Sequence, residues 1–143
     1  MQAGDLRRIT GCSDPELKQW VREGVIVPLR PGRGSGVHAD YDAANLVAVV
    51  LAKAMKEASI VVIGYASALA ELQVSLRAQS SLKWGGLQYL MTPDRCQVLR
   101  RGALQDQPPC AVVMDVSALF SRLKHGEHEI PRQLELLRLQ SVR

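Results

Sequence analysis

Apolar residues near the start of the chain recur with the spacing of a helix. Leu6 and Ile9 lie three positions apart, so they share one face of a short helix predicted over residues 5–10. Gly11 follows directly, and glycine readily adopts the left-handed conformation that ends a helix. The pattern therefore predicts a short first helix followed by a tight turn.

A second amphipathic stretch begins after this turn. Ser13 and Glu16 have the spacing of a capping box, in which each side chain pairs with a backbone N–H group at the start of a helix. The helix is predicted over residues 14–23, and Gly24 closes it. Two helices joined by a short turn that contains glycine form a helix-turn-helix. The buried stripe of the second helix is predicted to consist of Leu17, Trp20 and Val21.

The pattern then changes from helical to extended. Residues 25–29 are apolar and β-branched, which is typical of a short strand, and residues 37–41 are predicted to return as its partner. Between them, the Pro- and Gly-rich residues 31–36 are incompatible with a helix and predict a hairpin tip. We expect this hairpin to form a wing beside the two helices. It contains no acidic residue between positions 29 and 39, and its basic side chains are Arg30, Arg33 and His38.

The remainder of the chain carries two longer helical patterns and a small β-element. Asp42 is predicted to cap a helix over residues 43–58, and an Ala-rich helical pattern covers residues 61–80. The helical pattern ends at Trp84, after which short runs typical of strands alternate with residues typical of turns. These later elements are predicted as strands over 87–91, 96–100 and 111–116, and as helices over 117–124 and 131–142.

These elements predict a mostly α-helical fold with a small β component. We expect a winged helix-turn-helix head over residues 1–58 and a connecting helix over 59–83. Residues 84–143 would form a small α+β region with the order β-β-β-α. Its role is predicted to be either dimerisation or sensing.

Several residues in the predicted head stand at spacings that match together: Leu17, Trp20, Gly24, Pro28 and Arg30, followed by a Gly-rich turn and Tyr41. In this order they resemble the MerR family of winged-helix transcription regulators, over roughly residues 5–58. The resemblance implies that the second helix reads DNA, that the wing contacts the flanking backbone, and that Tyr41 also touches the backbone. Metal-sensing members keep cysteines in a C-terminal loop, whereas Cys96 and Cys110 here are far apart, which disfavours metal sensing.

A recognition helix holds its domain with one face and presents the other to the major groove. Lys18 and Arg22 lie four positions apart, outside the buried stripe, and so can reach adjacent phosphates or base edges. The wing arginines suit phosphate oxygens because guanidinium binds them through two hydrogen bonds. The full set of candidate DNA-binding residues is Arg7, Ser13, Lys18, Gln19, Arg22, Arg30, Arg33, His38 and Tyr41.

Structural alternatives exist for several of these candidates. Ser13 could serve only as a helix cap, and Lys18 could pair with Asp14 on a solvated helix surface. Tyr41 could be a core residue beneath the wing. Trp20 is assigned to the core because of its spacing from the other residues of the buried stripe.

Composition narrows the function without deciding it. The chain has 143 residues, 47% of them hydrophobic, and a net charge of +4, which permits binding to polyanions. Its three cysteines form no metal-type motif and are predicted to be reduced thiols. The His-Gly-Glu-His-Glu cluster at 125–129 is interpreted as a solvated turn rather than a metal site. The longest apolar run, 60–63, is too short to cross a membrane, so we expect a soluble intracellular protein.

The sequence thus predicts a DNA-binding transcription regulator that acts as a homodimer on double-stranded DNA, in the cytoplasm and associated with the nucleoid. No enzymatic motif, cofactor or metal is predicted, and an unknown small-molecule or protein effector is left open. One alternative is an excisionase-like or partition-type accessory that bends or bridges DNA. The other is a protein-interaction adaptor, for which salt-dependent DNA binding should be absent.

Overall fold

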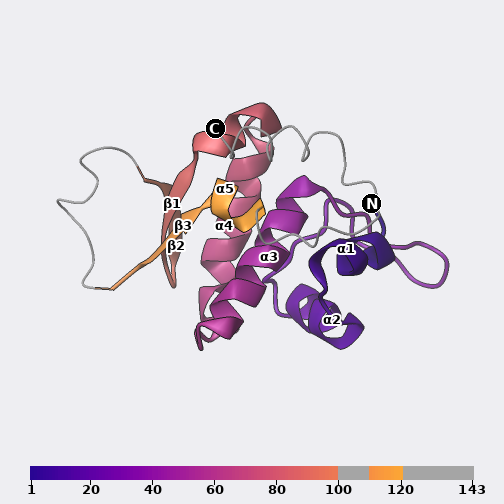
Figure 1. Cartoon of the computed structure of the whole chain (residues 1–143). Coiled ribbons are helices and arrows are strands. Elements are labelled where there is room, and N and C mark those ends of the chain that lie inside the picture. The colour runs from indigo at the N-terminus through magenta and orange to yellow at the C-terminus, as the bar shows by residue number, and fades with distance from the viewer. Residues whose placement is uncertain (100–109, 121–143) are drawn as a thin grey trace.

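The computed structural model describes residues 1–99 and 110–120. The head begins with two short helices, α1 (Ala3–Thr10) and α2 (Asp14–Arg22), which pack beside the longer helix α3 (Ala43–Glu57). Figure 1 shows α3 and α4 lying between this head and a small sheet at the opposite side of the molecule. The mostly helical fold with a small β component, predicted from the sequence, is confirmed.

The start of α2 follows the predicted capping box. The Glu16 backbone N–H donates to Ser13 Oγ at 3.3 Å, and the Ser13 N–H donates to Glu16 Oε2 at 3.3 Å. The preceding turn contains Gly11, whose φ of 73° lies in the left-handed region that favours glycine. The first two helices therefore end and begin where the local sequence predicts, although α1 starts two residues earlier than expected.

The predicted strands over 25–29 and 37–41 are wrong. We call residues 30–40 the wing loop. Its two arms are joined only by isolated β-bridges, one between Arg30 and Asp40 and the other between Arg33 and Val37. Val25 and Ile26 are buried, and their N–H groups donate to the Trp20 carbonyl. This segment pairs its backbone with the end of α2 and with side chains from other helices, so it does not form a ladder.

Helix α3 is apolar around most of its circumference because other elements cover it on several sides. It contacts α1 in the head, and it also contacts α4 (Ala66–Arg77) and α5 (Val116–Phe120). The predicted helix over 61–80 is shorter in the structure. It is preceded by a 3₁₀ turn, η1 (Val62–Tyr65), which contains Gly64, a residue with low helix propensity.

The β-element is a three-stranded antiparallel sheet with the order β2-β1-β3. It follows a second 3₁₀ turn, η2 (Ser81–Gly86). Its central strand pairs Met91 with Cys96 on one side and with Val112 on the other. The predicted strands are confirmed with shifted ends; their bounds are β1 (Gln88–Thr92), β2 (Arg95–Val98) and β3 (Val112–Asp115).

One hydrophobic core joins the head to the sheet. Leu6 and Trp20 from the head, Leu46 and Leu69 from α3 and α4, and Tyr89 from β1 all belong to the same buried cluster. Continuity of the core means that the described elements of head and body pack as one unit. The predicted helix at 131–142 and the histidine cluster at 125–129 lie outside the described residues. No helix among the described residues is long and apolar enough to cross a membrane.

Candidate nucleic-acid interface

Helix α2 has one buried face and one exposed face. Leu17 and Trp20 are 2% and 4% exposed, which confirms their assignment to the core, whereas Val21 is only partly buried. Three polar side chains of the same helix lie on its solvent side: Lys18, Gln19 and Arg22. The amphipathic arrangement predicted for a recognition helix is therefore present.

Two basic residues from different helices converge on one carboxylate beside this face. Lys18 Nζ lies 2.7 Å from Asp14 Oδ2, and Arg7 of α1 approaches Asp14 Oδ1 at 3.5 Å. The hydrogen bond from Lys18 is the main reason that the pKa of Asp14 falls below its usual value. The ion-paired alternative for Lys18 is thus the one that the structure shows. The Arg7 Nε atom is buried and has no hydrogen-bond partner among the described residues.

The other candidate DNA-binding residues on and before α2 differ in the hydrogen bonds and ion pairs that they form within the protein. Ser13 caps the helix while remaining exposed, and Gln19 Nε2 donates to Glu23 Oε1 at 3.0 Å. Arg22 is exposed, and it forms no ion pair within the described part of the chain. Arg22 is consequently the cation on this helix that is most available to an external partner.

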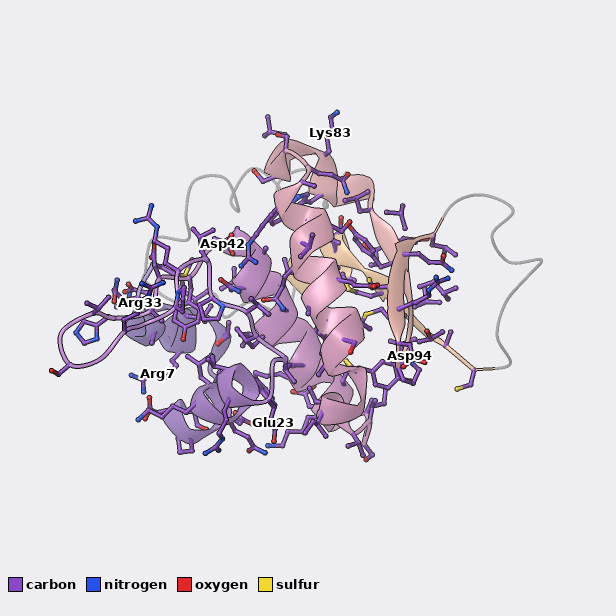
Figure 2. All side chains as sticks on the ribbon, turned by 180° about the vertical axis from the view of Figure 1, so that it is seen from behind. Arg7, Glu23, Arg33, Asp42, Lys83 and Asp94 are labelled. Atoms are coloured by element: carbon purple, nitrogen blue, oxygen red, sulfur yellow. The ribbon has the colours of Figure 1, made fainter. Side chains whose placement is uncertain are left out.

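The wing loop carries Arg30, Arg33 and His38, all of them exposed. Figure 2 shows Arg33 on this loop, with Arg7 on the same side of the molecule. The loop folds back tightly at Gly32, where an added Cβ would lie 2.9 Å from the Val37 carbonyl oxygen. Gly32 therefore permits the close approach of the two arms of the loop.

Tyr41 does not lie with the exposed candidates. It is 5% exposed and belongs to the hydrophobic core, and burial raises the pKa of its hydroxyl. Its burial agrees with the core alternative for this residue. Contact of Tyr41 with the DNA backbone stays a prediction.

Two lysines of α3 hold the helix-turn-helix in place, and sequence reasoning did not identify either contact. Lys53 Nζ donates to the Thr10 carbonyl at the end of α1, at 3.0 Å. Lys56 Nζ lies 2.6 Å from Glu16 Oε1, in the first turn of α2. Both contacts span about forty residues of sequence, so a local pattern carries no signal for them.

A buried polar network also fixes the segment between α2 and the wing loop. Gln73 of α4 donates to the Val25 carbonyl at 2.9 Å and accepts from the Val27 N–H at 3.0 Å. Asn45 of α3 donates to the Val27 carbonyl and to Gln73 Oε1, both at 2.7 Å. Both amide side chains are 0% exposed. The sequence signal was a polar residue at position 73, within the apolar face of a helical pattern.

An ion pair closes this network at the surface. Arg77 Nε lies 2.8 Å from Asp42 Oδ2, and an Arg77 terminal nitrogen donates to the Val27 carbonyl at 2.9 Å. Asp42 is also the cap of α3, because its side chain accepts from the Asn45 N–H at 3.0 Å. The start of α3, the end of α4 and the base of the wing loop are thereby joined.

The three cysteines are free thiols, and two of them have a raised pKa that lowers their reactivity. Burial raises the pKa of Cys12 to about 11 and that of Cys96 to about 12. Because the thiolate is the reactive species, these two side chains are poor nucleophiles near neutral pH. Cys110 is exposed.

The Lys56–Glu16 contact makes the stability of the head depend on pH. The hydrogen bond from Lys56 is the main cause that lowers the pKa of Glu16 below its usual 4.5. A carboxyl with a depressed folded-state pKa stabilises the fold above its unfolded pKa, and this contribution is lost as the pH falls through the folded value. We expect wild-type protein to lose more stability than Lys56→Met between neutral pH and about pH 3.

Urea unfolding at a series of pH values measures this difference. The control is Lys83→Met, which removes an exposed lysine from η2. Its pH profile should run parallel to that of the wild type in this range. Parallel profiles for Lys56→Met and wild type would contradict the assigned role of the contact.

The fold and this arrangement of side chains define a helix-turn-helix head with basic residues on one side. Residues 1–64 match the model of the MerR HTH family of regulatory proteins. The N-terminal part of the chain is therefore similar to the helix-turn-helix of MerR-type regulatory proteins, which supports a role in binding DNA. No curated protein matches the chain.

Proposed function

We propose that the protein is a sequence-specific DNA-binding transcription regulator in which α2 enters the major groove. The observation that carries this proposal is the exposed face of α2, where Lys18, Gln19 and Arg22 stand opposite the buried Leu17 and Trp20. A helix presented in this way offers side chains of suitable length to base edges and phosphates. Arg22 has no competing ion pair within the described residues, so it is our candidate for base contact.

The wing loop supplies the second part of the proposed interface. Arg30 and Arg33 are exposed, and the loop between positions 31 and 36 bears no side chain larger than proline except Arg33. The backbone can therefore approach a sugar-phosphate chain closely, with Arg33 as the phosphate ligand. Arg7, from α1, would contact the backbone between α2 and the wing loop, and His38 would lie at the edge of the contact.

We further propose that the protein works as a homodimer. A single head of this size makes few base contacts, whereas two heads on a two-fold axis read two half-sites and multiply specificity. The proposed operator is accordingly a pseudo-palindrome. This proposal rests on the requirements of recognition and on the small size of the head.

Two arginine substitutions test the interface, because the proposed contacts differ in kind. Arg33→Ala removes a phosphate contact, so we expect weaker binding to all duplexes and a salt slope reduced by about 1. Arg22→Ala removes a base contact, so we expect a loss of about 1–3 kcal/mol at the preferred site and little change elsewhere. Fluorescence anisotropy across salt concentrations, with a duplex from upstream of the gene, measures both effects.

Arg95→Ala is the matched control, because it removes the same charge from β2 at the far side of the molecule. It should leave affinity and specificity close to wild type. If neither Arg22→Ala nor Arg33→Ala changes DNA affinity at moderate salt, the proposed interface is wrong. Complete absence of salt-dependent binding by the wild type would instead favour the protein-interaction adaptor.

A further inference from the structure

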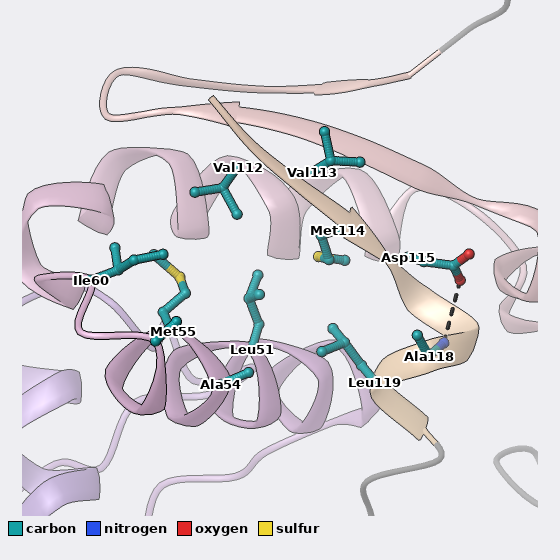
Figure 3. Close-up of a pocket in the computed structure, with 11 residues that line it drawn as sticks. Leu51, Ala54, Met55, Ile60, Val112, Val113, Met114, Asp115, Ala118 and Leu119 are labelled. Atoms are coloured by element: carbon teal, nitrogen blue, oxygen red, sulfur yellow. Dashed lines mark hydrogen bonds between the residues drawn. The ribbon is translucent and has the colours of Figure 1, made fainter. Parts of the chain in front are cut away.

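An apolar groove opens on the side of α3 that faces β3 and α5. Its volume is about 240 Å³, and its walls come from the end of α3 with the residues that follow it and from the consecutive elements β3 and α5 (Figure 3). Asp115 is the one acidic side chain among the lining residues, and no described cation pairs with it. The main apolar side chains around the groove are Leu51, Met55, Ile60, Val112, Met114 and Leu119.

The size and chemistry of this groove suit a few aliphatic side chains better than a separate small molecule. Small-molecule sites are usually larger, at roughly 300–1,000 Å³, and carry several convergent polar groups. Here Asp115 Oδ1 accepts from the N–H groups of Ser117 and Ala118, and Oδ2 accepts from Gln88 Nε2 at 3.3 Å without a cation beside it among the described residues. What remains is a shallow apolar surface with a negative charge at one end.

The chain itself leaves the described structure at this groove. Ala118 and Leu119 line it, and residues 121–143 follow directly after Phe120. Ten residues, 121–130, separate this point from the helix predicted over 131–142. They span up to about 33 Å when extended, which is ample for the later residues to return to the groove.

The predicted helix has the complementary pattern. Leu134 and Leu137 lie three positions apart on one face, and Arg138 follows Leu134 by one turn on the same side. A helix of this length is marginal on its own in water and needs an apolar surface to pack against. The arginine also complements the charge of Asp115.

We propose that residues 131–142 dock as a helix in this groove of the same chain. Leu134 and Leu137 cover the apolar lining of the groove, in which Met55 and Met114 are 2% and 3% exposed, and Arg138 faces Asp115. The docked segment covers the C-terminal half of α3. This inference is independent of the DNA interface, since the groove shares no residue with α2 or the wing loop.

Methionine methyl NMR on the full-length chain tests the docking. The chain has four methionines; Met55 and Met114 line the groove, whereas Met1 and Met91 do not. The double variant Leu134→Asp with Leu137→Asp places two charges on the proposed docking face. We expect the Met55 and Met114 signals to move by more than their linewidths, while those of Met1 and Met91 stay in place and report an intact fold.

The matched control is Leu136→Asp with Leu139→Asp, which has the same composition. A step of two residues turns a helix by about 200°, so these leucines lie on the other side. Their substitution should leave all four methionine signals unchanged. Unmoved Met55 and Met114 signals in the Leu134/Leu137 variant would overturn the proposal.

A second copy of the chain is the competing occupant, and dilution separates the two cases. Docking within one chain predicts wild-type methionine spectra that do not change over a tenfold dilution. If the Met55 and Met114 signals move on dilution toward their positions in the Leu134/Leu137 variant, the groove is an interface between copies and the proposal is wrong.

Discussion

Replacement of Trp20 by alanine is expected to lower the free energy of unfolding by about 4 kcal/mol, within the range for large aromatic side chains in a core. Trp20 is 4% exposed and belongs to the cluster that joins α2 to the rest of the molecule. The loss combines the transfer free energy of the indole with the cavity that remains, because the surrounding helices can close it only in part. Helix α2 would then be anchored chiefly by Leu17.

Urea unfolding followed by circular dichroism measures this change. Gln19→Ala is the control, because it alters the neighbouring residue on the exposed face of the same helix. Its effect should stay within about 0.5 kcal/mol, as is usual for surface positions. A loss of less than about 1 kcal/mol for Trp20→Ala would contradict its role as the principal anchor of α2.

The second large loss of stability is expected when Gln73 is replaced. Gln73→Leu keeps most of the side-chain volume but removes every hydrogen bond that this amide makes. The Val25 carbonyl and the Val27 N–H then lose a partner inside the protein. Because a buried polar group without a partner costs about 1–3 kcal/mol, we expect a total loss of about 3 kcal/mol.

The same substitution at Gln97, an exposed position of β2, is the matched control and should change stability by less than about 0.5 kcal/mol. Equal stabilities of the Gln73→Leu and Gln97→Leu variants would show that the buried network contributes nothing. Equilibrium unfolding in urea, with the slope m compared between variants, separates a true stability change from a change in cooperativity.

The network at Gln73 also bears on the proposed DNA interface. It holds the backbone of residues 25–27, which connects α2 to the wing loop, against α3 and α4. In the proposed complex, α2 and the wing loop contact DNA at the same time, so their relative placement must be maintained. The buried amides of Gln73 and Asn45 therefore act as positioning residues for an interface that they do not touch.

Local sequence predicted the elements whose causes are local. The capping box of Ser13 and Glu16, the left-handed Gly11 and the stripe that contains Trp20 depend on residues within one or two turns. The predicted DNA-contacting residues of α2 follow from the same stripe, since whatever lies opposite a buried face is exposed. Lys18, Gln19 and Arg22 are therefore placed on the solvent side as expected.

The predicted strands of the wing failed because their backbone partners come from elsewhere. The apolar, β-branched run at 25–29 is compatible with a strand, but its polar backbone groups are paired with Gln73, Asn45 and Arg77. Nothing within residues 25–41 indicates that these distant side chains will occupy the hydrogen-bonding positions of a ladder. The burial of Tyr41 could not be decided from the sequence for the same kind of reason, since burial depends on what packs over a residue.

The sequence by itself thus determined a helix-turn-helix head that resembles the MerR family and the side of α2 that faces solvent, because helical periodicity and end caps are short-range. Only the tertiary structure decided how that head is held. Lys53 and Lys56 of α3 reach α1 and α2, and Gln73 of α4 fixes the link to the wing loop. Each of these contacts pairs residues about forty or more positions apart, and such pairs become neighbours only when the core has formed.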